Sequence, residues 1–286
     1  MRLTRRRRLA LDPKALLAVW PLAAVATFLA FSSVSFAQDA DTADLPLLLG
    51  ARIALHNGMA EQADRDVRQY LAKHPNSADA HYMLGFVLFR EIQKRAADRN
   101  NSFRTDTAKA SLAEYTEGAK YRAPSYLDLK IVALDYVLLE DYADADKWLT
   151  RSLEWNPQDA ESWYDLGRIK YNEASFSEAL NAFDRSLTLD PGNVKAEDNL
   201  GMTYAGLGRT NDAISAFQNA IDWQARLQDK NPQPFIDLGT LLIDQKRPQE
   251  AIAYLLQATK ITPGNGSARA LLEKAQTLAN SAQAKP

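Results

Sequence analysis

The chain has 286 residues, of which 46% are hydrophobic and 24% charged, and its formal net charge is −2. This composition is typical of a globular protein and excludes a disordered or fibrous chain. Cysteine is absent, which excludes disulfides, thiolate metal sites, a catalytic cysteine and lipid attachment through an N-terminal cysteine.

The first 37 residues differ from the rest. They begin with a basic stretch, continue from Ala15 to Gln38 without a charge, and place small residues on both sides of Phe36. This order predicts an export signal over residues 1–37, cleaved after Ala37, with residues 38–43 as a short linker. An uncleaved membrane anchor is the alternative, because the charge-free stretch is long enough to span a bilayer.

Both alternatives place the remainder of the chain outside the cytoplasm, in the periplasm or secreted, and only residues 15–37, if uncleaved, would contact a membrane. Residues 1–37 hold six basic residues and one acidic residue, so the remainder has 28 basic and 35 acidic residues, a formal charge of −7. Proteins that bind nucleic acid concentrate lysine and arginine, so we expect no nucleic-acid partner.

A pattern that recurs every 34 residues follows from Asp44 onward. Such a period predicts stacked helical hairpins, each of which buries its apolar face against its neighbours. The second repeat carries about 14 extra residues, and an amphipathic stretch from Ser267 to Leu278, within 266–286, predicts a capping helix with a frayed tail. The six repeats span residues 44–77, 78–125, 126–159, 160–193, 194–227 and 232–265.

Small residues and prolines hold constant places in the repeat. Small side chains allow two helices to approach closely, and proline ends the second helix. In the second repeat, the count assigns Leu112 and Thr116 to the small and large positions of the second helix. The recurring residues are Gly85, Gly167, Gly201 and Gly239 at the eighth place, Ala145, Ala179, Ala213 and Ala251 at the twentieth, and Pro75, Pro157, Pro191 and Pro263 near the thirty-second.

These residues, together with Trp163, Leu166 and Phe183, resemble the tetratricopeptide repeat family over Asp44–Asn265. The resemblance implies an all-α, right-handed superhelical solenoid of about six hairpins with a C-terminal capping helix. It also implies a concave groove lined by the first helix of each repeat. Carried over by position, the groove candidates are Tyr82, Phe86, Phe89, Arg90, Lys130, Leu134, Val137, Leu138, Glu161, Tyr164, Arg168, Tyr171, Asn172, Lys195, Asp198 and Met202.

Aromatic side chains beside arginine and asparagine suit an extended peptide, so we expect a protein or peptide partner. The alternative is that several candidates, especially Phe86, Leu134 and Leu138, only pack within the solenoid. The family's clamp for a C-terminal carboxylate is not expected. Lys130 and Lys195 fit it, but Leu134, Asp165 and Asn199 replace its other members.

No catalytic or metal-binding constellation is evident, so we expect neither an enzyme nor a cofactor or metal. His56, His74 and His81 lack metal-ligand spacing, and a structural place for His81 is favoured over a ligand role. The segment Gly206–Gly208 reads as a turn. Asp141, Asp144 and Asp146 read as a helix start.

The insertion near residues 95–107 is locally basic, which suits either an acidic partner or an inert extension. Residues 91–97 are expected to prolong the first helix of the repeat, and residues 99–102 are expected to form a loop. The sequence as a whole predicts an exported, non-enzymatic scaffold that binds its partner through the groove. The alternative is a permanent structural subunit of an envelope assembly, secretion or cofactor-maturation complex.

Overall fold

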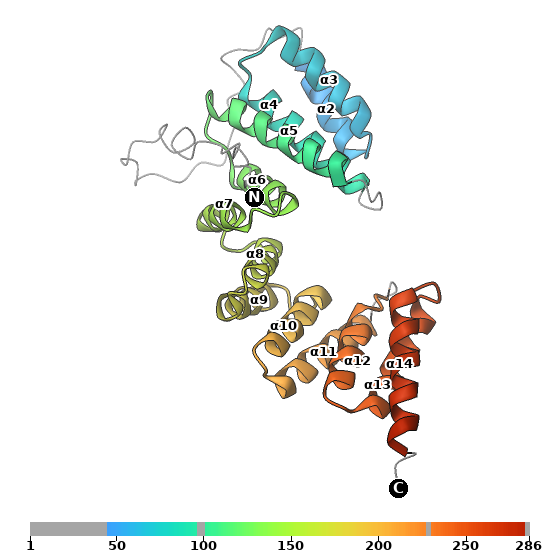
Figure 1. The fold of residues 1–286 in the computed structure, drawn as a ribbon. Coiled ribbons are helices and arrows are strands. Elements are labelled where there is room, and N and C mark those ends of the chain that lie inside the picture. The colour runs from blue at the N-terminus through green and yellow to red at the C-terminus, as the bar shows by residue number, and fades with distance from the viewer. Residues whose placement is uncertain (1–44, 96–100, 227–229, 284–286) are drawn as a thin grey trace, which may run out of the picture. The chain divides into compact units, whose positions relative to one another are not determined.

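The computed structural model describes residues 45–95, 101–226 and 230–283, and these residues form thirteen α-helices and no strand (Figure 1). The prediction of an all-α fold is therefore confirmed. The expected export signal and linker lie outside the described residues, as does part of the insertion. In the described part, no helix is both long enough and apolar enough to cross a bilayer.

The chain divides into two compact units, the first ending at Trp155. Within this unit each hairpin packs on the next, α3 against α4 and α5 against α6. The hairpins pair α2 (Leu45–His56) with α3 (Ala60–Lys73), α4 (Ala78–Lys94) with α5 (Asn101–Ala119), and α6 (Tyr126–Leu138) with α7 (Tyr142–Trp155).

The second unit begins at Asn156 and contains three further hairpins and a last helix. The last helix, α14 (Gly266–Gln283), packs against α13 and α12, and it is longer at both ends than the predicted stretch from Ser267 to Leu278. The hairpins pair α8 (Ala160–Asn172) with α9 (Phe176–Leu189), α10 (Val194–Gly206) with α11 (Thr210–Gln224), and α12 (Gln233–Asp244) with α13 (Pro248–Ile261).

Four hairpins close where a large side chain of the second helix covers a glycine of the first. A Cβ atom on Gly201 would lie 2.7 Å from Cδ1 of Phe217, and one on Gly239 would lie 2.7 Å from Cγ of Leu255. At separations below 3.0 Å an added Cβ atom would force a neighbouring group to move. The alanines at the twentieth place, Ala145, Ala179, Ala213 and Ala251, are fully buried.

The second hairpin makes the same contact, but with residues other than those that the repeat spacing predicted. Tyr115 lies over Gly85, where a Cβ would be 2.7 Å from Cε2 of the ring. Ser111, fully buried, donates to the Gly85 carbonyl at 3.0 Å. The prediction of Leu112 and Thr116 is therefore wrong by one residue.

The extra residues of this hairpin go into longer helices. α4 has 17 residues and α5 has 19, against 12 to 15 in the helices of the other hairpins. Asn101 and Ser102, expected in a loop, lie in the first turn of α5. α4 ends at Lys94, short of the expected extension to residue 97.

The ends of the hairpins also repeat. Residues with positive φ occupy the same place between the two helices of five hairpins, namely Gly58, Glu140, Ala174, Gly208 and Lys246. The exposed prolines Pro75, Pro157, Pro191 and Pro263 each follow a second helix by two residues. Serine hydroxyls tie two hairpins internally, because Ser152 donates to the Tyr126 carbonyl at 2.6 Å and Ser186 to the Ala160 carbonyl at 2.8 Å.

Candidate functional site

The first helices of successive hairpins contact one another directly. α4 contacts α6 in the first unit, and α10 contacts both α8 and α12 in the second. The side of such a row that faces away from the second helices is the candidate surface within each unit. The predicted groove residues lie on these helices, and their exposure separates packing residues from surface residues.

In the first unit three of the groove candidates lie in the interior. Tyr82, Phe89 and Lys130 are 4%, 6% and 7% exposed. The prediction that they line a groove surface is corrected, because neighbouring helices cover them. Phe86 and Arg90 are exposed one turn apart on α4, although Phe86 was one of the residues singled out for internal packing.

Tyr82 shows what such a buried residue does. Its ring stacks on Tyr115 with centroids 5.8 Å apart, and the guanidinium of Arg122 lies 5.4 Å from the ring centroid. Its hydroxyl donates to the Arg122 carbonyl, and burial raises its pKa. Tyr82 therefore joins the two helices of its hairpin to the turn that follows them.

In the second unit α8 presents a stripe of three candidates one turn apart, Tyr164, Arg168 and Asn172. The Arg168 guanidinium lies 5.6 Å from the centroid of the Tyr164 ring, and its Nη1 lies 3.4 Å from Oδ1 of Asp165. Asn172 is exposed and donates through Nδ2 to the Arg168 carbonyl at 2.8 Å. These contacts hold an aromatic ring, a cation and an amide on one helix face.

The remaining candidates of the second unit are divided. Tyr171 packs on Phe176 with ring centroids 5.5 Å apart, so it supports the hairpin from within. Lys195 is exposed at the start of α10. Tyr164 reaches this helix, because its hydroxyl hydrogen-bonds Asn199.

Two carboxyl groups meet beyond this contact. Asp198 on α10 hydrogen-bonds Asp237 on α12, and burial together with Asp237 raises the pKa of Asp198 to about 8. Burial also raises the pKa of Asp237, whose two oxygens accept from Nε2 of Gln233 at 2.9 and 3.1 Å. The row over α8, α10 and α12 therefore runs from Arg168 through Tyr164 to an acidic pair.

Sequence reasoning placed Asp198 on the groove but missed Asp237. Asp237 holds the sixth place of its repeat, which the carried-over groove positions do not include. The available signal was a carboxylate at the fifth or sixth place in three successive repeats, at Asp165, Asp198 and Asp237.

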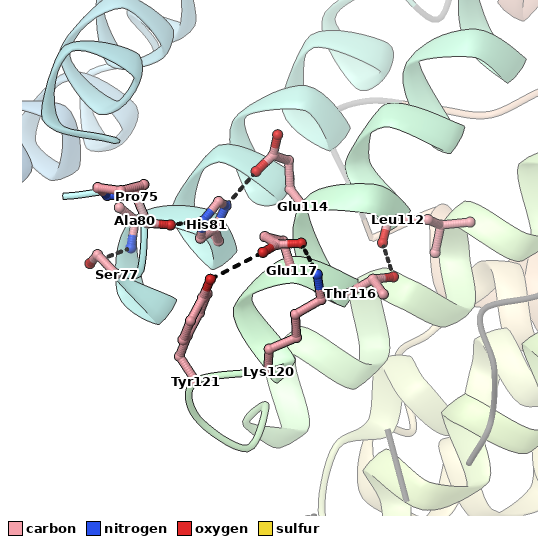
Figure 2. A network of polar contacts seen from close by, with 10 residues as sticks. All are labelled: Pro75, Ser77, Ala80, His81, Leu112, Glu114, Thr116, Glu117, Lys120 and Tyr121. Atoms are coloured by element: carbon pink, nitrogen blue, oxygen red, sulfur yellow. Dashed lines mark hydrogen bonds and ion pairs between the residues drawn. The ribbon is translucent and has the colours of Figure 1, made fainter. Parts of the chain in front are cut away.

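The residues singled out for possible chemistry have structural partners. His81 lies between Glu114 of α5 and the segment before α4, with Nδ1 2.7 Å from Glu114 Oε2 and Nε2 2.9 Å from the Pro75 carbonyl oxygen (Figure 2). It is 9% exposed, which confirms its structural place. Asp141 accepts from the Asp144 backbone N–H at the start of α7, as expected of a helix start.

The residues that the structure describes contain no group of three or more histidine or acidic side chains arranged to hold a metal ion. The segment Gly206–Gly208 joins α10 to α11 as a turn, with φ +71° at Gly208.

Comparisons with known proteins agree with this architecture. Two family models described as tetratricopeptide repeat match residues 133–194 and 204–275. The chain contains tetratricopeptide repeats. These repeats place the close contacts of Gly167, Gly201 and Gly239 in a known helical arrangement.

One curated relative is the anaphase-promoting complex subunit CDC16 of Saccharomyces cerevisiae, 24% identical over 175 residues, which are 59% of this chain and 20% of that protein. Across the curated relatives that it matches, the chain spans 13% to 20% of their length.

Two solved structures show the same fold. One is the hetero-tetramer Cut9–Hcn1 of the anaphase-promoting complex, with TM-score 0.60 and 18% identity, covering 81% of this chain and 42% of that one. The other is YrrB, described as a tetratricopeptide repeat protein with an unusual peptide-binding site, with TM-score 0.52 and 22% identity, covering 71% of this chain and 92% of that one.

Proposed function

We propose that this tetratricopeptide repeat scaffold binds a protein or peptide segment through the free face of α8, α10 and α12. The observation that carries the proposal is the row of Tyr164, Arg168 and the Asp198–Asp237 pair, which crosses three first helices within one unit. Aromatic and arginine side chains dominate the affinity of protein interfaces, and buried polar groups fix the register of the bound segment.

The proposal assigns binding rather than catalysis. The histidines of the described residues serve packing or helix ends, and Asp237 is the group that acts on Asp198, with no histidine or lysine among the causes of its shifted pKa. The fold likeness to YrrB, whose description names a peptide-binding site, supports a peptide segment as the kind of partner.

A photo-crosslinking experiment tests the site. A photoreactive amino acid is placed at Arg168 or Asn172 on α8, and, as a matched control, at the exposed Asn181 or Ser177 on α9. The proposal expects crosslinks to one partner segment from the α8 positions and not from the α9 positions. Crosslinks from α9 alone would instead identify the scaffold as a structural subunit held through its second helices.

Substitution then measures the contribution of the face. Tyr164→Ala with Arg168→Ala should weaken binding of the crosslinked segment by about 2–4 kcal/mol, whereas Asn181→Ala with Ser177→Ala should leave it unchanged. Equal affinity for both variants would reject the face. Thermal melting of each variant checks that the fold is retained, because the Tyr164 ring also packs near Phe183, with ring centroids 6.1 Å apart.

We further propose that the chain is exported, with the signal in residues 1–37 removed. The support is the order of a basic start, a charge-free stretch and a small-residue site in the sequence. Intact mass of the protein recovered from envelope fractions tests it. If the protein in the membrane fraction has the mass of a chain that starts at Met1, the anchored form would be favoured.

A further inference from the structure

The Asp198–Asp237 pair on α10 and α12 brings two acidic side chains together at a partly buried place in the second unit. Asp198 is 5% exposed, and its Oδ1 is buried without a hydrogen-bond partner among the described residues. Burying a carboxyl group without full compensation costs free energy, so such a group points to something that the free chain does not supply. Asp237 is half-buried and connects the pair to the surface.

The groups around the pair do not neutralise it. From α8, Tyr164 interacts electrostatically with Asp198, while the nearby cation Arg168 is engaged by Asp165 at 3.4 Å. From α12, Asp237 is the charged group that acts on Asp198. On the other side of α10, Asp184 of α9 and Asn219 of α11 interact with Glu197 instead.

We propose that the pair of Asp198 and Asp237 receives a basic side chain, lysine or arginine, of the bound partner segment, with the Tyr164 ring beside it. A cation at the half-buried Asp237 also offsets the charge of Asp198 buried behind it, and an aromatic ring next to the carboxyls adds a cation–π contribution. This inference rests on the proposed function, because it names the chemistry of the segment that the face binds.

Binding of a cation at this pair is coupled to protons. Because the pKa of Asp198 is raised to about 8, the pair retains a proton near neutral pH. A lysine or arginine side chain favours the fully ionised pair, so its binding releases that proton. Affinity is then expected to rise as the pH increases from about 6 to about 9.

A peptide-display experiment on the full chain tests the inference. Short random peptides are selected on the immobilised wild-type chain and, in parallel, on the double variant Asp198→Asn with Asp237→Asn. The matched control is Asp212→Asn with Asp222→Asn, which replaces the same number of carboxyl groups by amides at exposed positions on α11. Circular dichroism and thermal melting establish that all three proteins are folded.

The expected result is enrichment of peptides with a lysine or arginine at one constant place on the wild type and on the control, but not on the Asp198/Asp237 variant. Replacing that residue by norleucine should weaken binding to the wild type at least about tenfold and binding to the variant no more than about twofold. The wild-type affinity should also rise with pH, and the variant affinity should not.

Two outcomes overturn the inference and are distinguishable. Peptides that lose binding when Tyr164 and Arg168 become alanine, yet show no basic preference, would leave the proposed function in place and reject the role of the acidic pair. Peptides that bind the wild type, the Asp198/Asp237 variant and the Tyr164/Arg168 variant with equal affinity would reject both the role of the acidic pair and the proposed function.

Discussion

The ring of Phe183 lies so close to Gly167 that a Cβ atom there would be 2.5 Å from Cε1 of the ring. Gly167→Ala is expected to lower the free energy of unfolding by about 1–3 kcal/mol, because the ring or the helix must move to admit the methyl group. Chemical denaturation followed by circular dichroism measures this. Gly266→Ala is the matched control, since it meets nothing within 4 Å, and it should not destabilise the protein.

The acidic pair predicts a pH dependence of stability that is independent of any partner. The folded-state pKa of Asp198, about 8, lies above its ordinary value of 3.8. The protonated group therefore contributes its full stability below about pH 4, and this contribution is lost as the pH rises through about 8. Asp198→Asn removes this dependence. The melting temperature of the variant relative to wild type should rise with pH, and parallel curves would contradict the assignment.

Asp135 predicts a stabilising substitution. Its side chain is fully buried, and burial raises its pKa well above the ordinary value, which the Ser111 hydroxyl opposes only in part because neither carboxyl oxygen meets hydrogen-bond geometry. The nearby Ser111 hydroxyl is directed to the Gly85 carbonyl. Asp135→Val places an apolar side chain where Val87 and Ile169 stand in other repeats.

Asp135→Val should raise the free energy of unfolding at neutral pH by about 1–3 kcal/mol, because an uncompensated buried carboxyl is removed. Denaturant unfolding at neutral pH measures it. A loss of stability would show that the carboxyl has a partner that the side-chain contacts do not reveal, such as a buried water.

The contact between His81 and Glu114 predicts an energetic coupling across the second hairpin. Both ring nitrogens face acceptors, and the pair is largely buried, with His81 and Glu114 side chains 11% and 25% exposed. A double-mutant cycle of His81→Ala and Glu114→Ala should give a coupling of about 1–2 kcal/mol. The exposed pair Glu117–Lys120 on the same helix (Figure 2) should show no measurable coupling.

The sequence was sufficient for the repeats because their contacts recur at a constant spacing. The glycines at the eighth place and the large residues that cover them, such as Phe217 over Gly201, are visible as a period. The second repeat was one residue out of register because its insertion leaves the spacing undetermined. Only the structure shows Tyr115, rather than Thr116, over Gly85.

The groove was predicted less well, because position in a repeat does not report what covers a side chain. Tyr82 is buried by Tyr115 and Arg122, which belong to the long helix α5 and the turn after it. The meeting of Asp198 and Asp237 joins residues 39 apart on different helices, and no local pattern reveals that their carboxyl groups touch.

The left-handed residues between paired helices offer a last prediction. Ala174 has φ +57°, a conformation that costs an L-residue about 1 kcal/mol or more, whereas Gly208 holds the equivalent place at φ +71° without that cost. Ala174→Gly should raise the free energy of unfolding by up to about 1 kcal/mol, and thermal melting measures it. Ala143→Gly, at an exposed position within α7, should lower it.

The chain reverses in five hairpins through one residue in the left-handed conformation, and the energetic cost of that conformation depends on the residue type. Glu140, Ala174 and Lys246 retain a steric penalty that two glycines avoid. Replacing one of these three residues by glycine therefore offers a gain in stability at positions outside the helices of the proposed binding face.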